Sequence, residues 1–115
     1  MSEQIFATLV GVNFRGGEAI AFVRDSHTGH QWDLEAEPSN PYDANAVKVI
    51  DPGTGLFVGY LSRESNMETA AHLNSGGKAF ATTVSFLGTI KPHLLIEFGE
   101  RPVVEEVVDD ETPVD

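Results

Sequence analysis

The sequence predicts a mainly β domain, a small antiparallel barrel or sandwich of six or seven strands with one or two short helices. Three observations lead to this prediction. Short runs rich in β-branched and aromatic residues recur along the chain, glycine, proline and aspartate separate them, and one segment has a clear helical pattern. At 115 residues, with 41% apolar residues, the chain is long enough for one folded domain with its own core.

The expected strands are short and bounded by turn-forming residues. The alternation is clearest in residues 30–37, where Trp32, Leu34 and Ala36 alternate with polar residues as in a half-buried strand. Residues 19–24 are expected to return along the first strand as a hairpin, through a glycine-containing turn. The expected strands are 5–12, 19–24, 30–37, 46–50, 56–61, 79–87 and 93–98.

A helix is predicted after the strand of residues 56–61. Ser65-x-x-Glu68 has the form of a capping box, in which two side chains satisfy backbone N–H groups at the helix start. Gly76-Gly77 is expected to end the helix. Its narrow apolar face would consist of Met67, Ala70, Ala71 and Leu73.

The net charge of −11 is concentrated at the C-terminal end. Residues 97–115 contain eight acids and one base, which is −7, and leave ten acids and six bases, which is −4, for residues 1–96. We therefore expect a folded domain over residues 1–98 and an acidic, partly disordered tail over residues 99–115. The mild acidity of the body argues against a broad phosphate-tracking surface, but it is compatible with a small pocket for one strand end.

Several function classes lack their sequence signals. Without cysteine there is no disulfide, no thiolate zinc site and no cysteine nucleophile. Residues 11–17 are glycine-rich but lack the Walker lysine, and no nucleophile elbow is present. His27 and His30 form a weak metal-binding pattern, and we interpret them as solvent-facing loop residues, with no cofactor expected. No signal peptide or apolar run of about 18 residues is present, so we expect a cytoplasmic protein with no membrane contact.

The stretch EPSNPYDANAVKV, residues 37–49, is the most informative part of the sequence. Asn40, Pro41 and Asp43 are turn formers, so one interpretation is a capped turn with Tyr42 packed over the barrel end. The wider spacing favours a functional site, because NPYDANAVKV is followed by a turn, by VGYL and by a short helix.

This combination resembles the HIRAN domain family. The resemblance covers about residues 5–98. It rests on Val10-Gly11-Val12 with Phe14, on the block from Glu37 to Val49, on Val58-Gly59-Tyr60-Leu61, and on the helix and closing strands that follow. It implies a modified OB-like β-barrel that acts as a DNA-binding module and is not an enzyme by itself.

The resemblance also implies a ligand, the 3′-hydroxyl end of single-stranded DNA, in DNA repair or replication-fork processing. A helicase or other DNA-processing protein is the implied partner. Tyr42 would stack on the terminal base, and Asp43 would accept a hydrogen bond from the 3′-hydroxyl and repel a 3′-phosphate. Phe14 would be a second stacking wall, and Tyr60 would line the pocket.

The sequence departs from this family pattern at Asn13, where a basic residue is expected next to the aromatic position. The departure removes one phosphate contact, which Arg15 or Lys48 would replace. Two alternatives remain open at this point. The first is a protein–protein interaction module whose acidic body and tail deter DNA, and the second is a hydrolytic or metal-dependent enzyme that uses His27 and His30.

Overall fold

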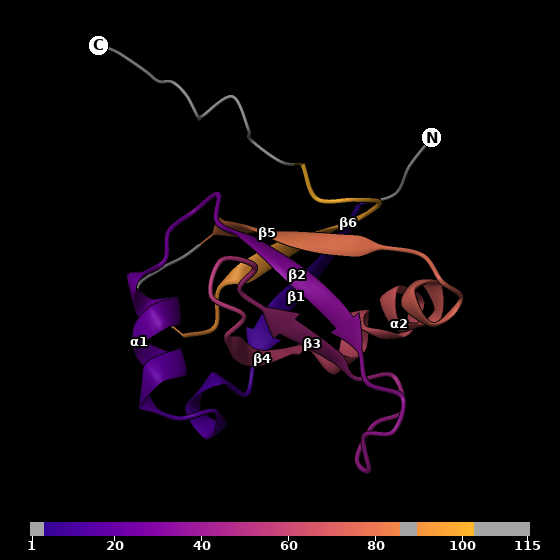
Figure 1. The fold of residues 1–115 in the computed structure, drawn as a ribbon, viewed down its shortest axis with the longest axis horizontal. Coiled ribbons are helices and arrows are strands. Elements are labelled where there is room, and N and C mark those ends of the chain that lie inside the picture. The colour runs from indigo at the N-terminus through magenta and orange to yellow at the C-terminus, as the bar shows by residue number, and fades with distance from the viewer. Residues whose placement is uncertain (1–3, 86–89, 103–115) are drawn as a thin grey trace.

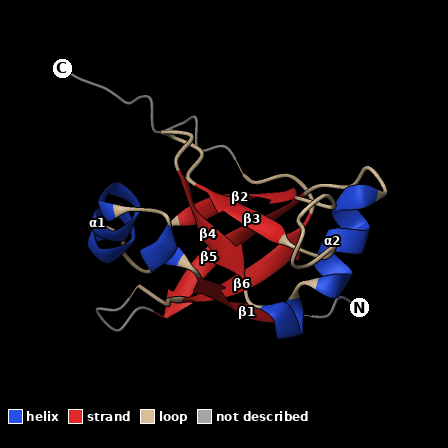
Figure 2. Cartoon of the chain, turned by 90° about the horizontal axis from the view of Figure 1, so that it is seen from below, coloured by secondary structure: helices blue, strands red, loops and turns tan. Residues whose placement is uncertain are grey.

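The structure is a computed structural model that describes residues 4–85 and 90–102. In this part of the chain, six antiparallel strands close into a barrel in the order β1-β4-β3-β2-β5-β6 (Figure 1, Figure 2). The strands are β1 (Ile5–Val10), β2 (Gln31–Ala36), β3 (Val47–Ile50), β4 (Phe57–Leu61), β5 (Ala79–Ser85) and β6 (His93–Phe98). The predicted mainly β, OB-like barrel is confirmed. Since every strand pairs on both sides, the barrel formed by the described residues has no open edge.

The inward-facing side chains of the strands form one core. Trp32 and Leu34 of β2 are buried and Ala36 is half-buried, as the alternation over residues 30–37 predicts. Trp32 Nε1 donates a hydrogen bond to Thr83 Oγ1 at 3.0 Å, so the largest core side chain keeps its polar group paired. The other strands contribute Ala7, Leu9, Val47, Val49, Val58, Leu61, Ala81, Leu94 and Ile96.

The predicted strand over residues 19–24 is wrong, because this segment lies in helix α1 (Gly17–Asp25). Ala19 and Val23 are buried and Ile20 packs against the core, a spacing that puts all three on one face of a helix. No hairpin forms at the preceding glycines. Instead, β1 ends at Val10, a 3₁₀ turn η1 (Val12–Phe14) follows, and α1 covers one end of the barrel (Figure 2).

Helix α2 (Met67–Asn74) occurs where a helix is predicted, but it begins differently. Ser65 belongs to a preceding 3₁₀ turn, η2 (Arg63–Ser65), and the N-cap residue is Asn66, which makes no side-chain capping bond. The predicted capping box is therefore wrong. The predicted apolar face is also only partly correct, since Thr69 and Ala70 are buried while Met67 is 66% exposed.

The C-terminal strands agree with the prediction as far as they are described. β6 has the predicted bounds, whereas the last residues of the predicted strand 79–87 fall outside the described part of the chain. After β6, Arg101 Nε donates a hydrogen bond to Asp33 Oδ1 at 3.1 Å, which holds the start of the predicted tail against β2. Residues 103–115 lie outside the described residues, so the acidic tail stays a prediction.

Candidate nucleic-acid interface

The loop of residues 37–46, here named the NPYD loop, extends from the barrel between β2 and β3 (Figure 1). Its conformation is set by Asn40, whose Oδ1 accepts hydrogen bonds from the backbone N–H groups of Tyr42 at 2.8 Å and Asp43 at 3.1 Å. Such side-chain bonds to the backbone two and three residues further on are typical of an Asx turn. The turn projects the Tyr42 side chain into solvent, where the residue is 85% exposed.

Asp43 is held by donors from the loop and from the segment before α2. Its Oδ1 accepts a hydrogen bond from the Asn45 backbone N–H at 2.9 Å, its Oδ2 accepts one from Asn66 Nδ2 at 2.9 Å, and Arg63 Nε lies 3.5 Å from Oδ2. The bonds from Asn45 and Asn66, together with the charge of Arg63, lower the pKa of Asp43 against a smaller opposing effect of burial. The carboxylate is ionised at neutral pH, and because a carboxylate has about four acceptor positions, it can also accept a hydrogen bond from a ligand hydroxyl.

A cavity of about 230 Å³ opens beside the NPYD loop. It brings together three of the residues predicted from the sequence, Tyr42, Asp43 and Tyr60, which come from the loop and from β4. The complete lining is Val10, Asn40, Tyr42, Asp43, Ala46, Tyr60, Leu61, Arg63 and Asn66. The cavity thus combines an ionised acceptor, an exposed aromatic ring and a guanidinium group in one small concave surface.

The wall of the cavity formed by Tyr60 is fixed by a hydrogen-bond network. The Tyr60 hydroxyl donates to Glu37 Oε1 at 2.8 Å, and Asn40 Nδ2 donates to the same oxygen at 2.9 Å. The bonds from Asn40 and Tyr60 lower the pKa of Glu37, whereas burial and then Glu37 itself raise the pKa of Tyr60. Glu37 is therefore ionised and Tyr60 protonated at neutral pH, which keeps the tyrosine ring in one orientation.

The close packing of β4 on β1 explains why a glycine, Gly59, precedes the tyrosine in VGYL. A Cβ atom at this position would lie 2.6 Å from the backbone oxygen of Val10, which is closer than side chains approach backbone atoms. The glycine thus permits β4 to pack closely on β1, where Val10 pairs with Tyr60. This close approach positions Tyr60 at the cavity.

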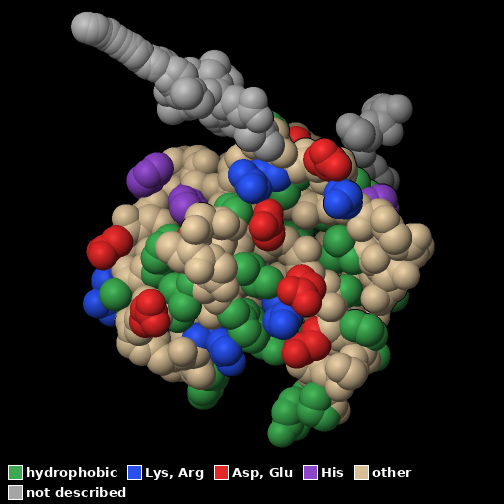
Figure 3. All heavy atoms as spheres, viewed as in Figure 1, with side chains coloured by type: hydrophobic (Ala, Val, Ile, Leu, Met, Phe, Trp, Pro, Cys, Tyr) green, Lys and Arg blue, Asp and Glu red, His purple; other side chains and the backbone are tan. Residues whose placement is uncertain are grey.

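The other predicted contact residues lie outside this cavity in the described part of the chain. Asn13 and Phe14 are exposed in η1, and Phe14 is 83% exposed. Figure 3 shows apolar side chains projecting from the lower edge of the molecule, below η1 and below the NPYD loop, on either side of a hollow with charged groups. The structure therefore brings together Tyr42, Asp43 and Tyr60 at the cavity and leaves Phe14 outside it, in η1.

Arg15 and Lys48 meet at a residue that the sequence interpretation did not select, Phe57. The Arg15 guanidinium carbon lies 3.8 Å from the centroid of the Phe57 ring, and Lys48 Nζ lies 5.1 Å from it. The Phe57 ring is in turn 5.2 Å from the Tyr60 ring, in an edge-to-face arrangement. The two predicted phosphate contacts are thus adjacent to the cavity wall and separate from its interior.

Sequence reasoning also missed Arg63 and Asn66 as cavity residues. Arg63 donates a hydrogen bond from its guanidinium to the Tyr42 backbone oxygen at 2.9 Å, and Asn66 binds Asp43. The only sequence feature that could have indicated them is their position, because both are polar and lie shortly after the VGYL strand. The contacts themselves join residues 21 to 23 positions apart in the chain, so no local pattern records them.

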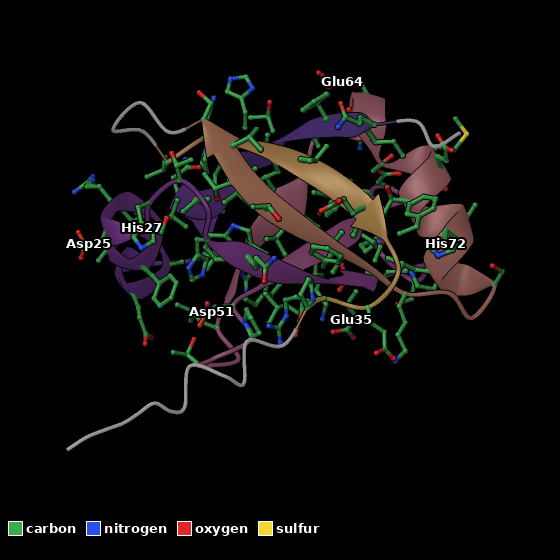
Figure 4. The ribbon with its side chains drawn as sticks, turned by 90° about the horizontal axis from the view of Figure 1, so that it is seen from above. Asp25, His27, Glu35, Asp51, Glu64 and His72 are labelled. Carbon is green, nitrogen blue, oxygen red and sulfur yellow. The ribbon has the colours of Figure 1, made fainter. Side chains whose placement is uncertain are left out.

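Of the two histidines in the turn after α1, His27 is exposed as predicted, whereas His30 is half-buried and is not the solvent-facing residue that was predicted. His30 Nε2 lies 2.7 Å from Asp51 Oδ1, and the His27 ring lies near His30. Figure 4 shows His27 and Asp25 at the end of α1, with Asp51 in the turn between β3 and β4. Within residues 4–85 and 90–102, no group of three metal-ligating side chains is gathered.

No helix in the described parts of the chain has the length and apolar character needed to span a membrane.

The small closed barrel, with a cavity bordered by the NPYD loop near one end of its strands, defines a β-barrel binding domain of the OB-like type. The sequence model of the HIRAN domain family matches residues 2–95, and the chain therefore belongs to the HIRAN domain family. The resemblance seen in the sequence is confirmed. HIRAN is a binding domain rather than a catalytic one. Membership of this family supports a DNA-binding module.

Two solved structures share the fold. A protein from Lactobacillus plantarum has a TM-score of 0.72 at 22% sequence identity, over 80% of this chain and 88% of that chain. The HIRAN domain of human HLTF has a TM-score of 0.65 at 22% identity, over 83% of this chain and 74% of that chain. No match was found among curated protein sequences.

Proposed function

We propose that this HIRAN domain binds the free 3′-hydroxyl end of single-stranded DNA in the cavity beside the NPYD loop. The observation that carries the proposal is the convergence of Tyr42, Asp43 and Tyr60 on one cavity of about 230 Å³. A cavity of this size is smaller than typical ligand pockets, which range from about 300 to 1,000 Å³. It suits a terminal sugar, with the attached base outside against an exposed aromatic ring.

Asp43 supplies the selectivity for a hydroxyl end. Its carboxylate is ionised and is held in place by Asn45 and Asn66, so it presents a fixed acceptor to the cavity. A 3′-hydroxyl can donate a hydrogen bond to this acceptor, whereas a 3′-phosphate brings a second negative charge next to it. The expected ligand is therefore a strand end with a free hydroxyl group.

The exposed aromatic residues supply affinity that is independent of base identity. Stacking of a base on an aromatic side chain contributes about 1–3 kcal/mol, and every base offers a π face. Tyr42 lies at the cavity, and the exposed ring of Phe14 in η1 offers a second stacking surface. Arg63 places a positive charge at the cavity wall for a nearby phosphate, and Asn13 contributes a neutral polar contact beside Phe14.

The proposed setting is DNA repair or replication-fork processing in the cytoplasm, together with a helicase or another DNA-processing protein. The domain would locate a strand end for that partner and would not act on DNA chemically by itself. The mild charge of residues 1–96 fits this role, since a site for one strand end needs few cations.

Fluorescence anisotropy with short 5′-labelled oligonucleotides tests the proposal. The protein is expected to bind the 3′-hydroxyl form more tightly than the 3′-phosphate form at low salt. Tyr42→Ala is expected to weaken binding by about 5- to 150-fold, the equivalent of a lost base stack. Equal affinity for the two ends, or no binding at micromolar protein, would overturn the proposal.

Asp43 needs a conservative variant, because it also shapes the loop. Asp43→Asn keeps an acceptor oxygen for Asn45 but removes the negative charge, and it is expected to reduce the preference for the hydroxyl end. Asp25→Asn is the matched control, since Asp25 is exposed at the end of α1. Thermal unfolding of each variant shows whether the fold is intact, and an unchanged end preference in folded Asp43→Asn would contradict the assigned role.

A further inference from the structure

We propose that Phe57, Arg15 and Lys48 form a second subsite that binds a backbone phosphate of the nucleotides preceding the 3′ end. This inference rests on the proposed function and extends it to the path of the strand outside the cavity. If this subsite is occupied, the bound DNA strand leaves the cavity past Tyr60 and crosses the outer surface of β3 and β4.

A β-bulge creates the subsite. Lys48 pairs with Tyr60 across the two strands and Val49 pairs with Gly59, but the next residue, Ile50, pairs with Phe57, so β4 contains one extra residue at this point. In a regular strand, side chains three positions apart, such as those of residues 57 and 60, point to opposite faces. The bulge brings the half-exposed rings of Phe57 and Tyr60 together at 5.2 Å.

Two cationic side chains from separate segments of the chain contact the ring of Phe57. The Arg15 guanidinium stacks on the ring at 3.8 Å and Lys48 Nζ lies at 5.1 Å. In the described part of the chain, no hydrogen bond or ion pair engages the Arg15 guanidinium. Its N–H donors are therefore free to form the bidentate bonds that arginine makes with phosphate.

The carboxylates around the subsite limit it to a single phosphate. Glu35 Oε2 lies 3.9 Å from Lys48 Nζ, and Glu37, which binds Tyr60, is ionised nearby. These two negative charges balance the two cations, so no continuous positive track forms. Because the contact between Lys48 and Glu35 is long, a phosphate can draw Lys48 away from it at low cost.

The subsite is at the right distance for a neighbouring nucleotide. Tyr60 lines the cavity, its ring is 5.2 Å from Phe57, and Phe57 is 3.8 Å from the Arg15 guanidinium. The guanidinium is consequently at most about 9 Å from the Tyr60 ring, and we assign to it the second phosphate before the terminal sugar, which a dinucleotide lacks. A ligand that ends in the cavity can thus contact Arg15 without passing over unrelated surface.

An oligonucleotide length series tests the inference. Unlabelled dinucleotides and hexanucleotides with 3′-hydroxyl ends compete against a labelled hexanucleotide for binding to the full chain. Arg15→Ala and Lys48→Ala are each expected to weaken hexanucleotide binding by about fivefold at low salt and dinucleotide binding by less than twofold. The double variant Arg15→Ala/Lys48→Ala should also reduce the slope of log affinity against log salt by about 0.7, the value for one phosphate contact of a single strand.

The matched control is Arg24→Ala, which removes the same charge from the exposed last turn of α1. If Arg15→Ala and Lys48→Ala behave like Arg24→Ala while the preference for a 3′-hydroxyl persists, the subsite is wrong and the proposed function stands. An equal loss at both lengths would also overturn the subsite. Loss of the hydroxyl preference in the unchanged protein would instead overturn the proposed function.

Discussion

The two loops that flank β3 each contain an aspartate that accepts a hydrogen bond from a nearby backbone N–H group. Only one of these aspartates borders the cavity. Asp43 in the NPYD loop accepts a hydrogen bond from the backbone N–H two residues further on, and Asp51 after β3 accepts one from Thr54, three residues further on. Asp51 is only 3% exposed, and its remaining bonds come from the Thr54 hydroxyl and from His30. The side chain of Asp43 is 21% exposed and borders the cavity.

The difference shows how one turn can become a binding site while its counterpart stays structural. At Asp51, His30 and Thr54 surround the carboxylate, so its charge serves the fold. At Asp43, Asn45, Asn66 and Arg63 contact the carboxylate, but the side chain still lines the cavity. A ligand in the cavity can therefore reach it.

Asp51→Ala is expected to give the largest effect on stability, because it removes a buried carboxylate that accepts hydrogen bonds from His30 and Thr54. We expect the free energy of unfolding to fall by about 3 kcal/mol, measured by chemical denaturation. DNA binding by the folded fraction should be unchanged. The comparison predicts the reverse order for Asp43→Ala, with a smaller loss of stability and a larger loss of binding. Equal destabilisation by the two substitutions would contradict it.

Gly59→Ala is expected to have the next largest effect, because its Cβ would meet the Val10 backbone oxygen. We expect about 2 kcal/mol of destabilisation and weaker DNA binding, since β4 must move and carries Tyr60 with it. Gly53→Ala is the matched control in the Asp51 loop, where the new Cβ would lie at an ordinary 3.5 Å from Asp51 Oδ2. Its effect should stay within about 0.5 kcal/mol. Similar losses in both variants would contradict the close approach of β4 to β1 that Gly59 permits.

Acidification is expected to weaken both loops more gradually. The pKa values of Glu37 and Asp43 lie below their ordinary values of 4.5 and 3.8 because of hydrogen bonds. Burial raises the pKa of Asp51, but bonds from Thr54 and His30 outweigh it, so the pKa also lies below 3.8. Groups with lowered pKa values stabilise the fold above their ordinary pKa, and this contribution is lost as the pH falls through the folded-state value.

We therefore expect the midpoint of thermal unfolding to be steady near neutral pH and to fall below about pH 4.5. Circular dichroism melts between pH 7 and pH 3 measure this dependence. Asp43→Asn and Asp51→Asn should each make the curve less steep, because each removes one of the titrating groups. A midpoint that stays constant down to pH 3 would contradict the assigned hydrogen bonds.

Local sequence pattern was sufficient for the strands that alternate clearly. Residues 30–37 have a period of two and contain β2, and residues 93–98 are a short run of apolar residues that forms β6. Residues 19–24 fit either period, because Val23 and Phe22 favour a strand while Ala19, Ile20 and Val23 share a helix face. Tertiary packing decided in favour of the helix.

The candidate site was predictable where its residues are close in sequence. Tyr42 and Asp43 lie in one motif, and the family resemblance connected them to Tyr60. The contributions of Arg63, Asn66 and Phe57 depend on how the barrel closes and on the bulge in β4. Pairing register and bulges are set by the whole sheet, so these contacts could not be read from any single stretch.

Asn40 also bears on the chemical ageing of the protein. Asparagine deamidates when the backbone nitrogen of the next residue attacks its side-chain amide to form a cyclic imide, a route that needs an N–H at that residue. The next residue is Pro41, which has none. The amide that holds both the loop turn and the network of Glu37 and Tyr60 is thus chemically durable. The site is thus protected against deamidation by this route, which would replace the N–H donor of Asn40 with a carboxylate acceptor.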